Sequence, residues 1–364
     1  MNHHRSFRGC LTVRARARRL MLGLVAVSTM VLGMAGMGAG PAAADTVIAT
    51  IDVGDFPQGV AITPDGSRAY VANFSDNSVS VIDTSTNTEL STVPLGGGAL
   101  PVGVAVLPGG SDVYVANAGA GTVSVIDTGT NMVDATVTVE SGPSGVTASP
   151  VGPRAYVANS NSDSVTAIDT DTNTEITSVT VGDAPNGLAV TPDGSRVYVA
   201  NNTDGDVDVI ETAGNSVVDT VTVGNLPLGV VVTPDGSRVY VANASDGTVS
   251  VIATAGNNVI DTIGVGNSPS GVAVTPDGTR VYVANGVDGT VSVIETAGNT
   301  VVDTVTVGGG PSGVAVTPDG TRVYVTNRLD DTVSVIAVEQ CLGSLCIDFG
   351  SLTGSGSGAG GVFS

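Results

Sequence analysis

Every tyrosine of this chain begins the same tetrapeptide, and this regularity restricts the possible folds more than any other feature of the sequence. Six copies read YVAN and the seventh reads YVTN. They start at Tyr70, Tyr114, Tyr156, Tyr198, Tyr240, Tyr282 and Tyr324. The step between copies is 44 residues once and 42 residues five times. Seven prolines, from Pro57 to Pro311, follow one another with the same steps. Seven regular copies of a unit this long indicate a repeat architecture.

Each unit contains four short, valine-rich segments that are separated by turn sequences. In the unit that begins at Pro269, the expected strands are Gly271–Thr275, Arg280–Ala284, Thr290–Ile294 and Val301–Val307. Their apolar and polar residues alternate with a period of two, which is typical of β-strands. Pro276-Asp277-Gly278 is a turn sequence, because proline presets its backbone angle and glycine adopts a positive φ. The pattern predicts an all-β, seven-bladed β-propeller with four antiparallel strands per blade.

The two ends of the repeat region predict how the ring closes. Residues 46–53 match the fourth strand of a unit, whereas the last unit, from Pro311, supplies three strands and stops near Val338. We therefore expect the N-terminal strand to complete the last blade, which leaves no open edge between blades. The propeller is predicted to span residues 45–338, followed by a flexible, cysteine-containing and Gly/Ser-rich tail over residues 339–364.

The first 44 residues differ from the rest and have the organisation of an export signal. Met1–Arg19 is basic, Leu20–Met37 is apolar, and three alanines, residues 42–44, precede Asp45. Basic, apolar and small-residue regions in this order predict a secretory signal peptide over residues 1–44 and a secreted or otherwise extracytoplasmic protein. The apolar run is close to the ~20 residues that span a bilayer, so an uncleaved anchor is the alternative.

The charge of the chain excludes some functions once the leader is set apart. The whole chain has a formal charge of −21, but both histidines and six of the thirteen basic residues lie in the leader, and no residue is lysine. The remainder has seven arginines against 34 acids, a net charge of −27. Such a chain lacks the basic surface of a nucleic-acid binder and the imidazole that serves most often as general base. After cleavage of the signal, we expect a monomer that has no nucleic-acid or membrane partner. Its expected partner is a protein or cell-envelope component whose surface is basic or is bridged by cations.

The repeats resemble those of the YVTN-family β-propeller proteins, which include YncE-like periplasmic proteins and surface-layer propellers. The YVAN and YVTN tetrapeptides, the PDG turns and the V-S-V-I-[DE]-T segments carry the resemblance over residues 46–338. Lactonases and the haem d1 domains of nitrite reductases are related propellers. The resemblance implies the fold and export, and leaves the function open.

We expect a non-enzymatic binding or scaffold protein at the cell envelope or outside the cell. The first strands of the units carry Gly, Ala and Val, and the fourth to seventh units are nearly interchangeable, whereas an active site needs an asymmetric cluster of polar groups. One alternative is a lactonase-like hydrolase, or a metal- or quinone-dependent enzyme that uses carboxylates. A calcium-binding surface or adhesion protein is the second alternative.

The candidate site residues lie mainly on one expected face of the ring. We call it the acidic face: the connections between second and third strands and those between successive blades. The possible partner residues there are Asp76, Asp163, Asp246, Asp288, Asp330 and Asp331. Asp204, Asp206 and Asp208 resemble a fragment of a calcium-binding loop, so calcium is the one cofactor considered. A solvated acidic rim and plain strand alternation are the alternatives.

Three further features are interpreted as structural. The asparagine that ends each YVAN or YVTN copy is expected to cap the same hairpin in each blade, because its side chain can bond the local backbone. The arginine that follows the PDG turn in most units is expected to form an ion pair between blades or within the turn. Cys341 and Cys346 are predicted to form a disulfide, because the protein is exported and these are the only cysteines after residue 44.

Overall fold

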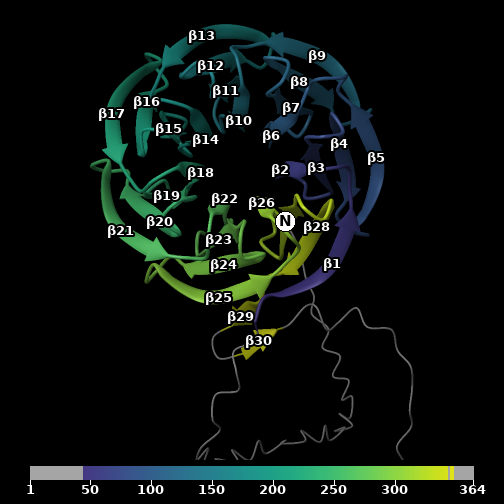
Figure 1. The fold of residues 1–364 in the computed structure, drawn as a ribbon, viewed down its shortest axis with the longest axis vertical. Helices are drawn as coiled ribbons and strands as arrows, with labels where there is room; N and C mark the ends of the chain where they lie inside the picture. The colour runs from purple at the N-terminus through teal and green to yellow at the C-terminus, as the bar shows by residue number, and fades with distance from the viewer. Residues whose placement is uncertain (1–43, 343–344, 348–364) are drawn as a thin grey trace, which may run out of the picture. The chain divides into compact units, whose positions relative to one another are not determined.

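The computed structural model describes residues 44–342 and 345–347, and their structure is all-β (Figure 1). Seven four-stranded antiparallel sheets surround a common axis, which confirms the predicted seven-bladed propeller. None of the described residues forms a helix long and apolar enough to cross a membrane. The predicted leader, apart from Ala44, lies outside the described residues.

Blades 1 to 4 follow one another along the chain with the same strand order. Blade 1 consists of β2 (Pro57–Ile62), β3 (Arg68–Asn73), β4 (Ser78–Asp83) and β5 (Thr88–Pro94). Blade 2 consists of β6 (Pro101–Val106), β7 (Asp112–Asn117), β8 (Thr122–Asp127) and β9 (Met132–Thr138). Blade 3 consists of β10 (Pro143–Ala148), β11 (Arg154–Asn159), β12 (Ser164–Asp169) and β13 (Thr174–Thr180). Blade 4 consists of β14 (Pro185–Val190), β15 (Arg196–Asn201), β16 (Asp206–Glu211) and β17 (Ser216–Thr222).

Blades 5 to 7 complete the ring, and the last one takes its outer strand from the N-terminus. Blade 5 consists of β18 (Pro227–Val232), β19 (Arg238–Asn243), β20 (Thr248–Ala253) and β21 (Asn258–Gly264). Blade 6 consists of β22 (Pro269–Val274), β23 (Arg280–Asn285), β24 (Thr290–Glu295) and β25 (Thr300–Thr306). Blade 7 consists of β26 (Pro311–Val316), β27 (Arg322–Asn327), β28 (Thr332–Ala337) and β1 (Thr46–Asp52).

The predicted closure is confirmed by the pairing of β1 with β28. The two strands are antiparallel, with Thr46 opposite Ala337 and Asp52 opposite Thr332. In Figure 1 the purple β1 lies against the yellow β28, so the two ends of the propeller share one sheet. The outer edge of β28 is thereby covered.

The hydrophobic core is divided into clusters that lie between successive blades. The two middle strands of each blade are buried on both faces, whereas the outer strand is mostly exposed. Tyr114 of blade 2, for example, packs in one cluster with Val146, Val157 and Ile168 of blade 3. A cluster with Tyr324 of blade 7 and Ile82 of blade 1 joins the last blade to the first. Each blade therefore depends on both neighbours for burial of its apolar surface.

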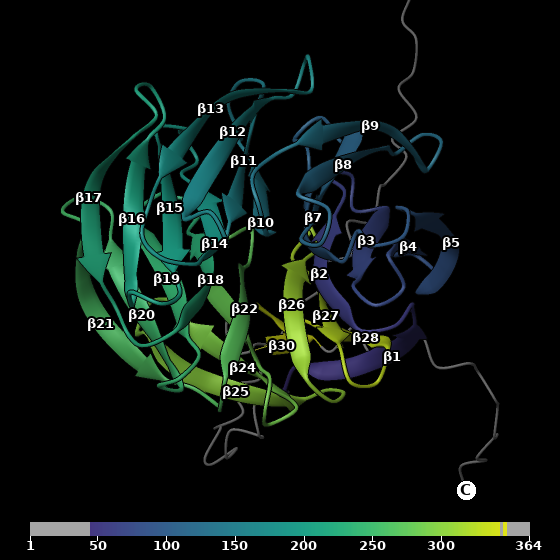
Figure 2. The same cartoon turned by 45° about the horizontal axis from the view of Figure 1, so that its top comes forward.

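The innermost strands approach one another more closely than side chains would allow. Neighbouring inner strands such as β10, β14 and β18 run side by side around the centre (Figure 2). A Cβ atom on Gly229 would lie 2.2 Å from the carbonyl oxygen of Ser270 in the next blade, and one on Gly313 would lie 2.4 Å from that of Gln58. The X-Pro-x-Gly motif of each unit therefore provides the close backbone contact that joins one blade to the next.

Candidate functional site

The acidic face is held together by the carboxylates that the sequence suggested for partner binding. Asp76 accepts a hydrogen bond from the backbone N–H of Asp55 at 2.7 Å, and Asp288 accepts one from that of Asn267 at 2.7 Å. The aspartates at the same position in three other blades do the same: Asp204, Asp246 and Asp330. Each of these carboxylates fastens the connection that enters its blade to the hairpin within that blade.

Two other suggested partner residues link neighbouring blades. Asp163 accepts a hydrogen bond from the backbone N–H of Ala184 at 2.9 Å, and Asp331 accepts one from that of Phe56 at 2.9 Å. All six suggested partner residues thus lie on the predicted face, and each also binds a backbone amide of a connecting loop. Hydrogen bonds from Asn225 and Asn267 hold the pKa of Asp246 and Asp288, respectively, below the usual value.

The three aspartates suggested for calcium bind different partners. Asp204 accepts the N–H of Asp183, and Asp206 accepts a hydrogen bond from the Nδ2 of Asn201 at 2.8 Å. Asp208 is buried and accepts hydrogen bonds from Gly182 and Thr220. Burial raises the pKa of Asp206, and repulsion from Asp208 adds to this effect. Within the described residues, no three His, Cys, Asp or Glu side chains are grouped as a metal site.

The asparagine of each tetrapeptide holds the predicted hairpin, but its side-chain nitrogen donates to neighbouring side chains and not to the local backbone that was expected. Asn73 is fully buried, and its Nδ2 donates to the hydroxyls of Ser78 and Ser80 at 3.0 and 2.9 Å. In blade 7, Asn327 also accepts a hydrogen bond from the N–H of Gly308, in the loop that enters the blade. The side chain thus holds the hairpin between the second and third strands and, in blade 7, the connection from the preceding blade.

The repeated arginines join successive blades, but the expected ion pair is wrong for most of them. The Nη1 of Arg154 donates to the carbonyl oxygen of Thr212 in the next blade at 2.7 Å. Four other arginines make the same contact with a threonine carbonyl: Arg68, Arg196, Arg238 and Arg322. A carbonyl serves as acceptor because the turn of the next blade presents its backbone there. In the described part of the chain, only Arg280 pairs with a carboxylate, that of Asp45, at 3.1 Å.

Tyrosine–asparagine hydrogen bonds join five pairs of successive blades on the opposite face, and they were not expected from the sequence. The hydroxyl of Tyr198 donates to Oδ1 of Asn257 at 2.8 Å, and that of Tyr240 donates to Asn299 at 2.9 Å. Each asparagine lies in the turn between the third and fourth strands of the following blade, at a positive φ near 50°. The recurrence of this asparagine every 42 residues is the sequence signal from which the contact could have been predicted. Desolvation raises the pKa of these tyrosines, that of Tyr114 to about 12.

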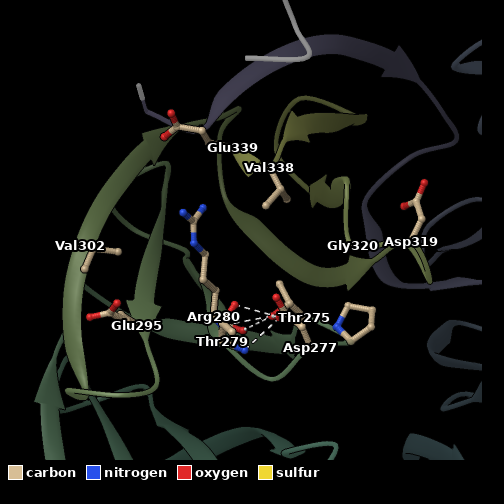
Figure 3. A pocket seen from close by; sticks show the side chains of 11 residues that line it. Thr275, Asp277, Thr279, Arg280, Glu295, Val302, Asp319, Gly320, Val338 and Glu339 are labelled. Carbon is tan, nitrogen blue, oxygen red and sulfur yellow. Dashed lines mark hydrogen bonds between the residues drawn. The ribbon is translucent and has the colours of Figure 1, made fainter. Parts of the chain in front are cut away.

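The corresponding contact at the closure has a different composition. Asp45 is only 5% exposed, and its Oδ2 accepts the hydroxyl hydrogen of Tyr282 at 2.7 Å. Its Oδ1 accepts hydrogen bonds from Arg280 and from the backbone N–H of Glu339. A cavity of about 550 Å³ lies beside this contact, lined in part by Arg280, Glu339 and Asp319 (Figure 3). In Figure 3 the guanidinium of Arg280 extends toward Glu339.

Similar cavities recur between other blades, so the fold itself produces them. They have volumes of about 490, 320 and 250 Å³, and each is lined by the PDG-type turn and arginine of one blade and the turn of the next. The cavity between blades 6 and 7 differs because Val338 and Glu339 contribute to its wall.

One apolar and cationic patch breaks the repetition of the acidic face. The rings of Phe56 and Phe74 lie 6.1 Å apart, and the guanidinium carbon of Arg328 lies 6.0 Å from the centre of the Phe56 ring. Val287 and Leu329, in the hairpins of blades 6 and 7, are 74% and 68% exposed. We call these five residues the Phe–Arg patch. They come from blades 6, 7 and 1, around the point where the ring closes.

The two cysteines of the C-terminal segment lie opposite each other. The strands β29 (Gln340–Leu342) and β30 (Leu345–Ile347) form an antiparallel pair in which Cys341 and Cys346 are partners in the backbone register. Directly opposed residues are near enough for a disulfide when their side chains are oriented suitably. The disulfide stays a prediction, and the rest of the predicted tail lies outside the described residues.

We predict that the aspartates of the PDG turns make the free energy of unfolding decrease in acid. Hydrogen bonds from Thr191 and Thr233 hold the pKa of Asp193 and Asp235 at about 2. Since these pKa values are lower in the folded state than in the unfolded chain, the stabilisation is complete above about pH 4 and is lost as the pH falls toward 2. Urea titrations monitored by circular dichroism should show this decrease in the free energy of unfolding. An Asp193→Asn, Asp235→Asn double variant should show a shallower decrease; an equal slope would contradict the assignment.

Comparison of the chain with known proteins shows the family to which it belongs. Residues 128–218 and 234–347, more than half of the chain, match a family model described as lactonase, 7-bladed beta-propeller. A solved structure of Kuenenia stuttgartiensis hydrazine synthase is similar, with a TM-score of 0.71 and 27% identity, over 78% of this chain and 96% of that chain. No curated protein matches the sequence. The narrower YncE-like or surface-layer assignment stays a prediction. The chain belongs to the seven-bladed β-propeller family of the lactonases.

Proposed function

We propose that this chain is an exported binding or scaffold protein, located at the cell envelope or outside the cell, that binds a basic protein surface through its acidic face. The observation that carries this proposal is the Phe–Arg patch. Exposed apolar groups beside aromatic rings and an arginine are the residue types that contribute most to binding energy in protein interfaces. The repeated aspartates of this face, by contrast, hold loop backbone.

The surroundings of the patch indicate the chemistry of the partner. Asp55, Asp76 and Asp288 are exposed, and Asp330 is exposed beside Leu329. The hydrogen bonds that Asp76, Asp288 and Asp330 accept from backbone amides leave these carboxylates with lone pairs and charge that face solvent. We therefore expect a partner whose apolar side chain enters the patch while lysines or arginines face the aspartates.

Capture from an envelope extract of the producing cell tests this proposal. The immobilised chain should retain a protein with a basic surface, and more salt in the wash should weaken binding because the rim is electrostatic. A Val287→Ser, Leu329→Ser double variant should bind about tenfold or more weakly, as expected when interface anchors are removed.

The matched control is a Met132→Ser, Val218→Ser double variant. Both residues are exposed on outer strands, at 66% and 51%. This variant should bind like the wild-type chain. Equal binding by the patch variant and the wild-type chain would show that the captured protein does not use the Phe–Arg patch.

The family match favours lactone hydrolysis as a second candidate function. Assays with small lactones, monitored by proton release, separate the two candidates. Turnover by the wild-type chain that is unchanged in the Val287→Ser, Leu329→Ser variant would support the hydrolase and count against binding as the main function.

A further inference from the structure

The contact at Asp45 reproduces, with different atoms, the inter-blade contact made by an asparagine elsewhere. In blade 6, Oδ1 of Asn299 accepts the hydroxyl hydrogen of Tyr240, while its Nδ2 donates to Asp261 of blade 5 at 3.0 Å. In blade 5, Asn257 makes the same two contacts, with Tyr198 and Asp219. One amide group thus joins a tyrosine and an aspartate of the preceding blade.

At the closure these two roles are divided between two groups of Asp45. Its carboxylate accepts from Tyr282, as the asparagine carbonyl does, and its backbone nitrogen donates to Oδ2 of Asp303 at 3.0 Å. Asp303 occupies the position of Asp219 and Asp261 in its own blade, since the three are spaced 42 residues apart. The main-chain nitrogen of residue 45 therefore takes the place of the amide nitrogen of asparagine.

While residue 45 remains in a peptide bond, its nitrogen carries no charge, and the carboxylates near this contact outnumber the cations. Asp45, Asp303 and Glu339 supply three carboxylates, whereas Arg280 forms an ion pair with that of Asp45. Glu339 is 9% exposed, and its Oε1 is buried without a hydrogen-bond partner among the described residues. A buried carboxylate oxygen without a donor is costly, so the site has capacity for a further cation.

We infer that the chain is cleaved between Ala44 and Asp45 and that the new α-ammonium of Asp45 strengthens the inter-blade contact at the closure by pairing with Asp303. The inference rests on the export part of the proposed function. Cleavage is a hydrolysis: the bond between the Ala44 carbonyl carbon and the Asp45 nitrogen breaks, and water supplies a hydroxyl group to the carbon and a hydrogen to the nitrogen. The carboxylic acid formed at Ala44 then transfers its proton to the amine. The Ala44 carboxylate and the Asp45 ammonium are the products. Because Asp45 is buried in the closed ring, cleavage precedes closure.

The test compares two forms of the protein that both run to Ser364. One starts at Asp45 and is made by removing an N-terminal fusion without leaving extra residues; the other keeps the three alanines, residues 42–44. Near pH 6.5 the Asp45 form should have a Tm about 2–4 °C higher, the shift expected from one additional ion pair in a chain of this size. Pairing raises the pKa of the α-amino group above its usual value of about 8. The advantage is therefore full below pH 8 and disappears as the pH rises through the shifted value.

Two variants separate the proposed pair from a general effect of the extra residues. Asp303→Asn should abolish the Tm difference between the two forms, whereas Asp261→Asn should lower the Tm of both forms equally. Equal Tm values at pH 6.5, or a difference that persists in Asp303→Asn or at high pH, would overturn the inference.

The mass of the protein recovered from the producing cell provides an independent readout. A mass that starts at Asp45 supports the inference, and any other N-terminus contradicts it. These measurements use no binding partner, so a failure of the proposed binding function would leave them unchanged, and their failure would leave binding through the Phe–Arg patch unaffected.

Discussion

Deletion of residues 45–54 from the chain that starts at Asp45 is expected to abolish the cooperative thermal transition. This segment contains β1, which pairs with β28 over its full length and contributes the buried Ile51 to the cluster between blades 7 and 1. Its loss exposes the edge of β28 and removes the Asp45 contacts with blade 6. Because each blade buries apolar surface only against its neighbours, a defect at one interface weakens the whole ring.

Circular dichroism and size-exclusion chromatography of the truncated chain check this prediction. A permuted chain, in which residues 45–54 follow Val338 through a short linker, is the matched control because it has the same strand and can close the same sheet. We expect the permuted chain to melt cooperatively. A truncated chain with the Tm of the full chain would show that β1 is not needed for closure.

Asp45→Ala is expected to cause the largest loss of stability among single substitutions at the closure. The change leaves the buried hydroxyl of Tyr282 and the guanidinium of Arg280 without their acceptor. Removing one partner of a largely buried ion pair and hydrogen bond is expected to cost about 2–4 kcal/mol. Equilibrium unfolding in urea at pH 7 measures the change in the free energy of unfolding.

Two further variants show whether the charge or the acceptor matters. Asp45→Asn keeps an acceptor for Tyr282, like the asparagines of other blades, and should cost less than Asp45→Ala. Asn299→Ala removes the corresponding uncharged contact with Tyr240 and should cost about 1 kcal/mol, which is typical of a neutral hydrogen bond. If Asp45→Ala cost no more than Asn299→Ala, the paired charges at the closure would add nothing to stability.

Much of the fold could be predicted because its signals are local. The alternating valines, the PDG turns and the repeat step act within a single unit, and they led to seven blades of four strands. The match of residues 46–53 to a fourth strand predicted the closure, since a strand without a hairpin partner must find one elsewhere. The asparagine of the tetrapeptide was correctly expected to hold its hairpin, because its partners lie within seven residues, although they are hydroxyls such as those of Ser78 and Ser80 where backbone groups were expected.

The candidate site was predicted less well because its contacts cross between units. The sequence placed the aspartates on one face, but it contained no sign that Asp163 or Asp331 binds a backbone amide of the next blade. The arginines were assigned the wrong acceptor for the same reason. Phe56 and Phe74 meet within blade 1, but Arg328 is far from both in the chain, and only the closed ring brings it next to Phe56.

The sequence by itself determined the number of blades, the strands within them, the acidic character of the chain and the strand that closes it. These properties follow from periodicity and turn chemistry, which act over a few residues. Only the tertiary structure decided which carboxylates hold loops, where the Phe–Arg patch forms and what Asp45 binds. Asp45 and Tyr282 are 237 residues apart in the chain, and their contact exists because the ring returns to its starting point. The angle between blades decides which groups meet, and it arises from packing between repeats rather than from any one repeat.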